Sequence, residues 1–197
     1  MEGFDFVYCQ RQQLAEPNEL IITHVSNFRK VKRVEDVVET FYRIQQKTPA
    51  KLMMVGDGPE RSPAEDLVKS LGIKDKVIFF GNSNEVDSIL KYSDLFMLAS
   101  ETESFGLAAL EAMACSVPVI STNAGGLPEV NVQGVTGFMS DIGQVDDMAR
   151  NALHILKDNE TLKQFKTNAL NHSKTFSADN IVPIYEKIYQ EAMSLTK

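Results

Sequence analysis

One stretch decides the fold of this chain, LIITHVSNFRKVKRVEDVVETFYRIQQKTPAKLMMVGDGP at residues 20–59. It begins with a continuous apolar run at 20–25, which is typical of a strand buried on both faces. Residues 33–47 then place apolar side chains on one helical face: Val34, Val37, Val38, Phe41 and Ile44. A second apolar run at 51–55 ends in a glycine-rich turn. Strand, helix and strand in this order predict two parallel strands joined by a crossover helix.

The same alternation continues through residue 140 and then changes to helices alone. Further strands are predicted at 76–81, 94–100, 117–121 and 136–140. Helices are predicted at 62–72, 85–93, 105–115 and 126–131, followed by 144–157, 159–171 and 177–194. Apolar strands that alternate with amphipathic helices indicate a parallel sheet covered on both faces. We therefore expect an α/β fold, a doubly wound, Rossmann-like parallel sheet of about six strands with C-terminal helices.

The composition argues against several classes of protein. Lysine and arginine number 20 against 27 aspartates and glutamates, which gives a net charge of −7 at pH 7. Binding of nucleic acid or anionic membranes without sequence preference needs clustered positive charge, so we expect neither as a partner. No apolar run approaches the roughly 20 residues of a membrane span, and the first residues lack a signal-peptide pattern. The two cysteines, Cys9 and Cys115, have no metal-ligand spacing, so we expect a reduced, cytoplasmic protein without a metal.

Polar or glycine-rich loops follow five of the predicted strands, at 26–33, 56–60, 81–85, 101–106 and 122–129. In a doubly wound sheet the ligand binds outside the carboxyl ends of the strands, so these loops predict the place of the site. The first loop is basic; alone, such a run is more often a solvated surface, but its place after a buried strand favours an anion site. The loops lack the GxGxxG and GxxxxGK[ST] spacings, which argues against NAD or FAD and against a Walker-type NTPase.

The fourth loop leads into the apolar helix predicted at 105–115. Glu103 or Ser104 is placed to cap this helix, so that its first amide N–H groups point into the cleft. These amides belong to Phe105, Gly106 and Leu107. A helix N-terminus of this kind binds phosphate, and a glycine there lets the backbone approach a ligand closely.

Two carboxylates flank the same segment. Glu103 precedes the helix and can accept hydroxyl groups of a sugar, while Glu111, further along, can accept both hydroxyls of a ribose. Together with the basic loop and the helix N-terminus, they match a nucleotide-sugar. A plainer alternative stays open at this point, in which Glu103 only caps the helix and Glu111 faces solvent.

These residues also resemble a known family. The segment ESFGLAALE at 103–111 resembles the E-x7-E motif of the retaining glycosyltransferases of family four, which have the two-domain GT-B architecture. EAMACSVPVISTNAGGLPEV at 111–130 resembles the segment that follows in that family, and the resemblance covers nearly all of residues 20–195. The motif is specific because both glutamates, the Phe-Gly pair and the downstream Gly-Gly-x-Pro-Glu occur in order.

The resemblance implies roles for individual residues. Glu111 would hold the ribose, and Glu103 with the backbone from Ser104 through Phe105 and Gly106 to Leu107 would hold the sugar and the diphosphate. Lys32 matches the diphosphate-binding lysine of the family. The arginine that usually stands five residues earlier is Asn27 here, and Arg29 could supply the charge. Gly58 matches the glycine turn beside the donor, and the loop starting at Gly81 would border the base. The implied catalytic residues are Glu103, Lys32 and Arg29, without metal or cofactor.

The resemblance further implies a domain organisation. Residues 1–18 would be a lead-in or linker, 19–172 a nucleotide-sugar-binding domain, and 173–197 a helix that braces an amino-terminal domain. The chain would then be the donor-binding half of the enzyme, inactive alone, with a small-molecule acceptor bound mainly by the other half. The stretches HVSNFRKVKRVEDVV, VGDGPE and TESFG look most similar to the subgroup that joins N-acetylglucosamine from its UDP donor to L-malate in bacillithiol synthesis. A surface exposed without the other half would favour a homo-oligomer.

Two alternatives share the same cleft. The chain could be a nucleotide-sugar-binding module without catalysis, or half of a nucleotide-sugar epimerase of the same architecture, although E-x7-E is not the usual epimerase signature. His24 ends a buried strand, where a hydrogen-bonded core histidine is expected more often than a catalytic one.

Overall fold

The computed structural model describes residues 11–195 of the chain, and its centre is a six-stranded, fully parallel sheet. The strands are β1 (Leu20–Val25), β2 (Ala50–Val55), β3 (Val77–Gly81), β4 (Leu95–Leu98), β5 (Val119–Thr122) and β6 (Gly137–Ser140). Their order across the sheet is β3-β2-β1-β4-β5-β6, so the chain winds outward in both directions from β1. The expected doubly wound, Rossmann-like fold is confirmed.

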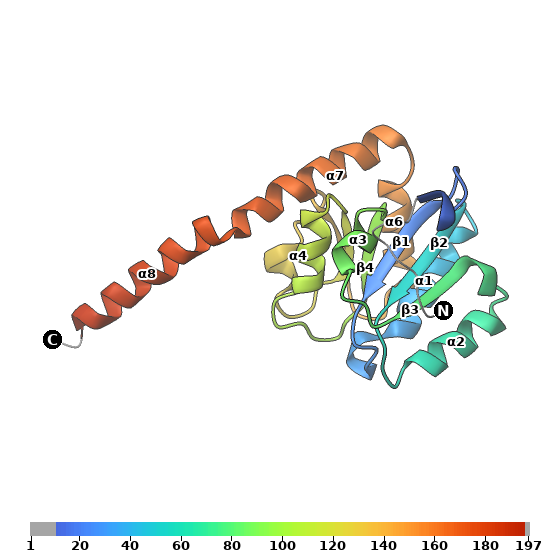
Figure 1. The fold of residues 1–197 in the computed structure, drawn as a ribbon, viewed down its shortest axis with the longest axis horizontal. Coiled ribbons are helices and arrows are strands. Elements are labelled where there is room, and N and C mark those ends of the chain that lie inside the picture. Colours follow the sequence, from blue (N-terminus) through green and yellow to red (C-terminus); the bar gives the residue numbers. More distant parts are fainter. Residues whose placement is uncertain (1–10, 196–197) are drawn as a thin grey trace.

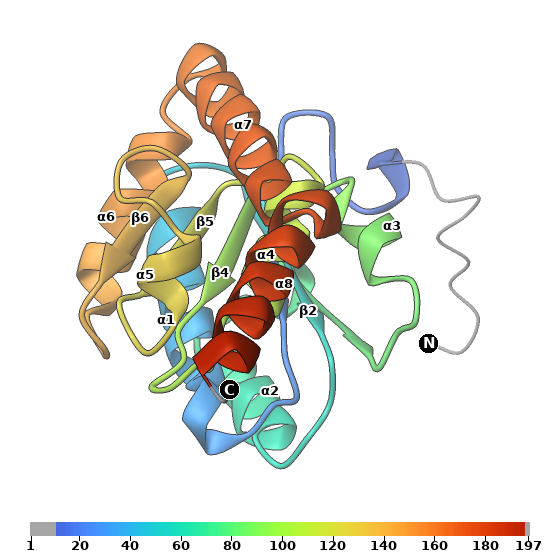
Figure 2. The ribbon, with the colours of Figure 1, turned by 90° about the vertical axis from the view of Figure 1, so that its left-hand side faces the viewer.

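Helices cover both faces of this sheet (Figures 1 and 2). The longer helices are α1 (Val34–Gln45), α2 (Arg61–Ser70), α4 (Leu107–Ala114), α6 (Val145–Ile155), α7 (Asn159–Ser173) and α8 (Ala178–Leu195). Within residues 11–195 there are also two short helices, α3 (Val86–Leu90) and α5 (Leu127–Val130), and four 3-10 turns: η1 (Arg11–Gln13), η2 (Lys30–Lys32), η3 (Lys74–Lys76) and η4 (Lys174–Phe176). On one face α1 packs between α2 and α6, and on the other α4 contacts α3, α5 and α7.

The buried strands explain why the apolar runs are continuous. Ile21 and Ile22 are neighbours on β1 and point to opposite faces of the sheet, yet neither is exposed at all. Ile22 belongs to the core under α1 and α6. Ile21 packs on the other face, with Ile89 of α3 and with Leu14 and Ala15, which follow η1. Burying such a side chain contributes about 2 kcal/mol, and both faces of β1 contribute in this way.

The strand order also fixes where a ligand can bind. After β1 the chain turns to β2 on one side, and after β3 it crosses over to β4 on the other side. The crossovers therefore diverge at the carboxyl ends of β1 and β4, where they leave a crevice between the loops. Three predicted loops, at 26–33, 101–106 and 122–129, follow β1, β4 and β5 at this edge.

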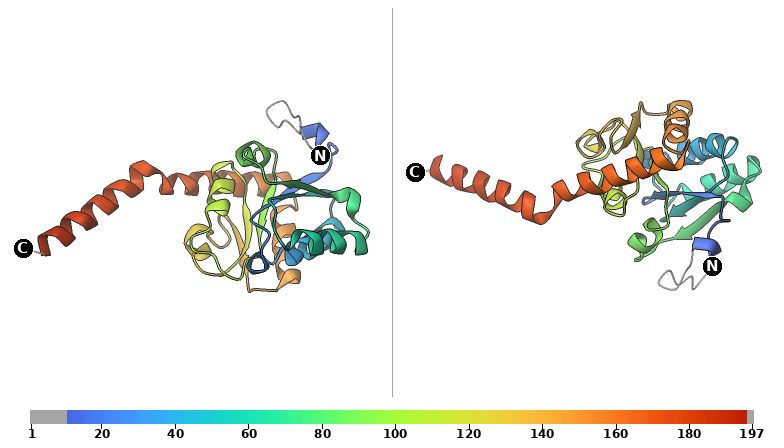
Figure 3. Two further views of the ribbon diagram at one scale, coloured as in Figure 1. Left: turned by 60° about the horizontal axis from the view of Figure 1, so that its bottom comes forward. Right: turned by 90° about the horizontal axis from the view of Figure 1, so that it is seen from above.

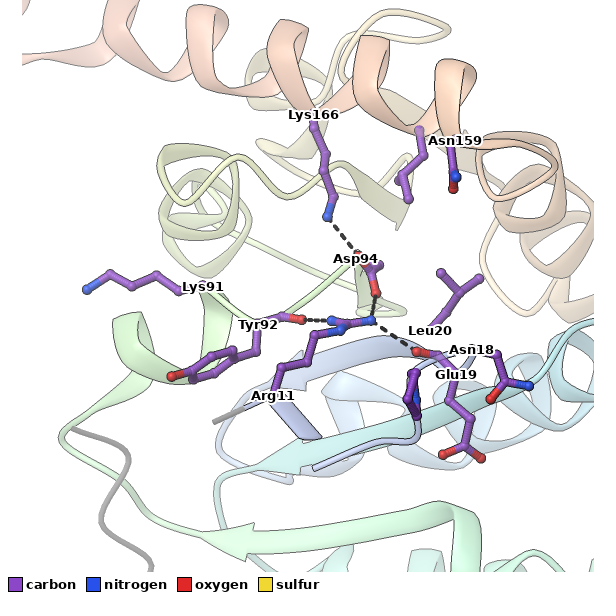
Figure 4. A pocket seen from close by; sticks show the side chains of 11 residues that line it. Arg11, Asn18, Glu19, Leu20, Lys91, Tyr92, Asp94, Asn159 and Lys166 are labelled. Carbon is purple, nitrogen blue, oxygen red and sulfur yellow. Dashed lines mark hydrogen bonds and ion pairs between the residues drawn. The ribbon is translucent and has the colours of Figure 1, made fainter. Parts of the chain in front are cut away.

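At the opposite edge of the sheet, a buried carboxylate, that of Asp94, directly precedes β4 (Figure 4). Its two oxygens accept hydrogen bonds from Arg11 at 2.7 Å and Lys166 at 2.8 Å, and from the backbone N–H of Ile21 at 3.0 Å. Burial alone would raise the pKa of this carboxyl, but Lys166 and the other donors hold the pKa below its ordinary value. These contacts attach η1 and α7 to the sheet. Residues 1–10 of the predicted lead-in lie outside the described part of the chain.

The chain leaves the body of the domain at η4, and α8 projects away from it (Figures 1 and 3). Its exposed apolar side chains include Val182, Ile184, Tyr185, Ile188 and Tyr189. Among the described residues, no helix combines the length and the apolar character needed to cross a membrane.

Candidate donor site at the switch point of the sheet

A pocket of about 340 Å³ opens at the carboxyl ends of β1 and β4. It is lined by Val25, Ser26, Asn27, Lys32, Glu103, Ser104, Phe105, Gly106, Leu107 and Ala108. Seven of the residues singled out from the sequence lie in this lining: Asn27, Lys32, Glu103, Ser104, Phe105, Gly106 and Leu107. They come from the loop after β1 and from the loop after β4, which meet only because the strands are neighbours in the sheet.

An ion pair joins the two loops across the pocket. Lys32 Nζ lies 2.5 Å from Glu103 Oε1, and only 18% and 14% of the two side chains are exposed. Ser100 donates a second hydrogen bond to the same oxygen at 2.8 Å, whereas Oε2 has no partner among the described residues. Partial burial strengthens the attraction of Lys32 for an anion relative to a surface lysine. In the part of the chain that the structure describes, Lys32 is the one cationic side chain of the lining.

Backbone contacts hold both loops in place. The N–H of Glu101 donates to the carbonyl of Val31 at 2.8 Å, which ties the loop after β4 to η2. From β5, the hydroxyl of Thr122 donates to the carbonyl of Ser100 at 2.6 Å. Backbone and hydroxyl contacts among the segments at the carboxyl ends of β1, β4 and β5 thus fix Lys32 opposite Glu103, in addition to the ion pair between the two side chains.

The Gly-Gly turn after β5 packs against the loop after β4. Gly125 has a φ of +57°, and a Cβ on it would lie 2.0 Å from the carbonyl oxygen of Glu103. A Cβ on Gly126 would lie 2.5 Å from the carbonyl oxygen of Ser104, and the N–H of Gly126 donates to the Glu103 carbonyl at 2.8 Å. The two glycines therefore allow the turn to pack directly against the backbone that carries Glu103.

The start of α4 differs from the prediction. The helix begins at Leu107 rather than at 105, and its N-cap is Gly106, with no side-chain cap from Glu103 or Ser104. Gly106 has a φ of +95°, which no helical residue adopts, so the turn before it cannot belong to the helix. The Gly106 carbonyl accepts from Ala109 and Leu110. The first two amides of α4, those of Leu107 and Ala108, have no partner within the helix and lie at the pocket.

Four predicted site residues lie outside this lining, two of them with side chains that face solvent. Arg29 is exposed at the start of η2. Glu111 is also exposed, but it lies one helical turn beyond Leu107 and on the same face of α4. Glu111 therefore lies on the side of α4 that carries Leu107, which lines the pocket.

The other two residues are the glycines that follow β2 and end β3. A Cβ on Gly58, whose φ is +154°, would lie 2.7 Å from the carbonyl oxygen of Phe28, so a glycine is needed where the loop after β2 crosses the loop after β1. Gly81 has a φ of +74°, and its carbonyl accepts the N–H of Gly56 at 2.8 Å. Gly58 therefore shapes the backbone next to the loop that carries Asn27, whereas Gly81 joins the loop after β2 to the end of β3.

His24 and Ser26 form a pair that the sequence did not single out as a site. His24 is fully buried, with Nδ1 2.9 Å from the carbonyl oxygen of Met97 and Nε2 2.7 Å from Ser26 Oγ. The expectation of a hydrogen-bonded core histidine is confirmed. Burial lowers the pKa of His24 to about 4, and the charge of Lys32 acts in the same direction.

This pKa predicts a loss of stability in mild acid. Because the folded pKa of about 4 lies below the ordinary 6.5, the unfolded chain takes up a proton at a pH where the folded chain does not. The stabilisation is fully present above pH 6.5 and is lost as the pH falls toward 4. Between pH 7 and pH 5, the free energy of unfolding of wild type should fall by about 2 kcal/mol more than that of His24→Gln, as measured by urea unfolding. Equal losses in the two proteins would contradict a neutral, buried His24.

Comparison with known proteins identifies the family of the chain. The family described as glycosyl transferases group 1 matches residues 9–172. The chain belongs to this family of glycosyltransferases. The predicted family and the GT-B type of fold are thereby confirmed.

Among curated relatives, this glycosyltransferase chain is 43% identical over 190 residues to the N-acetyl-alpha-D-glucosaminyl L-malate synthase of Bacillus anthracis. The match covers 96% of the chain and 50% of that protein, so the chain spans about half the length of this relative. The crystal structure of Anabaena HepE in complex with UDP and glucose is 26% identical, with a TM-score of 0.80 over 98% of this chain and 55% of that one. The structure of sucrose-phosphate synthase from Thermosynechococcus elongatus is 26% identical, with a TM-score of 0.82 over 94% of this chain and 48% of that one.

Proposed function

We propose that this glycosyltransferase chain is the donor-binding half of a retaining enzyme that transfers a sugar from a UDP-sugar. The observation that carries the proposal is the pairing of Lys32 with Glu103 beside the free amides of α4, at the switch point of the sheet. A diphosphate needs a cation and N–H donors, and a sugar needs acceptors for its hydroxyls. This pocket offers both within a single space.

The diphosphate fits the side of the pocket formed by Lys32 and the start of α4. Lys32 has three N–H donors and uses one of them for Glu103, so the others can reach phosphate oxygens. The amides of Leu107 and Ala108, with the positive end of the helix dipole, add donors for the same group. Glu103 keeps its unpartnered Oε2 for a sugar hydroxyl, and Glu111 is the candidate for the ribose diol.

The same contacts suit the reaction. When the sugar leaves, negative charge grows on the diphosphate, and donors already aimed at it stabilise that charge without reorganisation. Lys32 and the α4 amides would take this role, with Glu103 close to the sugar. Arg29, exposed on the same loop, could add a further charge when the donor is bound.

The identity of donor and acceptor is proposed from the relatives. The name of the Bacillus anthracis protein specifies an N-acetylglucosaminyl group joined to L-malate, and the HepE structure holds UDP and glucose. UDP-N-acetylglucosamine as donor and L-malate as acceptor, in bacillithiol synthesis, are the corresponding assignments for this chain. The 43% identity supports them more strongly than the weaker matches do.

We further propose that residues 19–172 form the donor domain and that 173–197 brace an acceptor-binding domain. The exposed apolar side chains of α8 support a covering partner of this kind. Without it, the chain would bind the donor but transfer no sugar to malate.

Calorimetric titration of the chain with UDP and with UDP-N-acetylglucosamine tests the donor site. Glu111→Ala should weaken the binding of both ligands by about tenfold, near 1.4 kcal/mol, because each ligand carries the ribose. Glu160→Ala, at an exposed glutamate in the first turn of α7, is the matched control and should change neither affinity. Absence of any UDP binding by the wild-type chain would refute the proposed function.

A further inference from the structure

The hydroxyl of Ser26 has a direction that its surroundings determine. Ser26 follows β1 and lines the pocket, and its backbone is fixed because its N–H donates to the carbonyl of Val55 at 3.1 Å. Behind it, Nε2 of the buried His24 lies 2.7 Å from Ser26 Oγ. The ring of His24 is held in turn by the Met97 carbonyl and by stacking on Phe28, with ring centroids 5.9 Å apart.

The protons of this chain of contacts can be assigned in order. The carbonyl oxygen of Met97 can only accept a hydrogen bond, so Nδ1 of His24 must carry the proton. In a neutral ring, Nε2 then has a lone pair and can only accept. The hydrogen bond between His24 and Ser26 therefore requires that Ser26 donate its single hydroxyl proton to Nε2.

The neutral ring is itself favoured by the site. Burial and the nearby charge of Lys32 disfavour a charged His24; the hydrogen bond to the Met97 carbonyl and the carboxylate of Glu103 act in the opposite direction, but burial outweighs them and the pKa is lowered. A protonated ring would have to donate from both nitrogens, which would reverse the Ser26 contact. Near neutral pH the hydroxyl of Ser26 thus presents only its lone pairs to the pocket.

We propose that Ser26 is a specificity-determining acceptor for a hydroxyl or amide N–H group on the sugar of the donor, and that His24 is the positioning residue that makes it so. The proposal rests on the proposed function and deepens it. A phosphate oxygen has no proton to offer, so Ser26 would meet it acceptor to acceptor, and the diphosphate is directed to Lys32 instead. Turning the hydroxyl to donate toward the ligand would leave Nε2 buried without a partner, which is unfavourable.

The experiment compares UDP with UDP-N-acetylglucosamine by calorimetry on the full chain, because only the second ligand carries the sugar. Ser26→Ala should weaken binding of UDP-N-acetylglucosamine five- to tenfold and change UDP binding less than twofold. Equal weakening of both ligands, or no change in either, would overturn the proposal. Loss of UDP binding by wild type would instead refute the donor site itself, so the two failures are distinguishable.

Variants of His24 test its positioning role by a separate readout, the ratio of the two dissociation constants. His24→Gln keeps an amide donor and a carbonyl acceptor and should preserve most of the preference for the sugar-bearing ligand. His24→Leu releases the hydroxyl and should reduce that preference to the level of Ser26→Ala. Circular dichroism melting identifies variants that fail to fold, and Ser26→Ala, which removes one atom near the surface, keeps the proposal testable in that case. A preference that stays unchanged in a folded His24→Leu would overturn the assignment of His24.

Discussion

Replacing Lys32 with alanine should weaken UDP binding by about 100-fold, near 2.7 kcal/mol. A charge-assisted hydrogen bond contributes about 1.5–3 kcal/mol, and the small exposed fraction of the Lys32 side chain limits screening by solvent. The substitution also leaves Glu103 without its cation. An uncompensated carboxylate would then face the diphosphate, so repulsion adds to the lost attraction. Calorimetric titration with UDP measures the effect.

Lys30→Ala is the matched control for this substitution. Lys30 lies in the same 3-10 turn and carries the same charge, but it is exposed and does not line the pocket. Its removal should change the affinity for UDP less than twofold. If both variants weaken binding alike, the basic loop acts through its total charge alone, and the assignment of the diphosphate to Lys32 is wrong.

The fold could be predicted because its cause is local in the sequence. Strands buried on both faces have to be apolar at every position, as Ile21 and Ile22 illustrate, while helices such as α1 need only one apolar face. The alternation of the two patterns is readable from one chain. The crossover rules then restrict the strand order, so the loops that carry Lys32 and Glu103 could be expected at one edge.

The site was less predictable because its details depend on contacts between distant segments. Ser104 looked like a helix cap, but Gly106 packs against Leu127 and takes a positive φ, which moves the start of α4 to Leu107. No local pattern reports such a contact. The direction of the Ser26 hydroxyl likewise depends on the carbonyl of Met97, more than seventy residues away on a neighbouring strand.

The Gly-Gly turn shows how the same distant contacts connect stability with binding. Gly125 touches the backbone of Glu103, and Glu103 touches Lys32, so a change in the turn reaches the pocket through two direct contacts. An alanine at 125 meets two obstacles. An L-residue at positive φ costs about 1 kcal/mol, and relief of the overlap with the Glu103 carbonyl costs about 3 kcal/mol more.

Gly125→Ala should therefore lower the free energy of unfolding by about 4 kcal/mol and the melting temperature by roughly 10 °C. The variant should still fold at temperatures below its lowered melting temperature. In the folded variant, UDP binding should be weaker because Glu103 and the start of α4 are displaced together. Thermal melting and calorimetry with UDP measure the two effects on the same sample.

Gly72→Ala separates the two causes. Gly72 also has a positive φ, +69°, but a Cβ there would meet nothing within 4 Å. It should cost only about 1 kcal/mol, the strain of the backbone alone, with unchanged UDP binding. If the two alanines destabilise equally, the contact between the turn and Glu103 contributes nothing. If Gly125→Ala destabilises strongly but binds UDP like wild type, the loop at 103–107 is not where the diphosphate binds, because a displaced backbone there could not hold it unchanged.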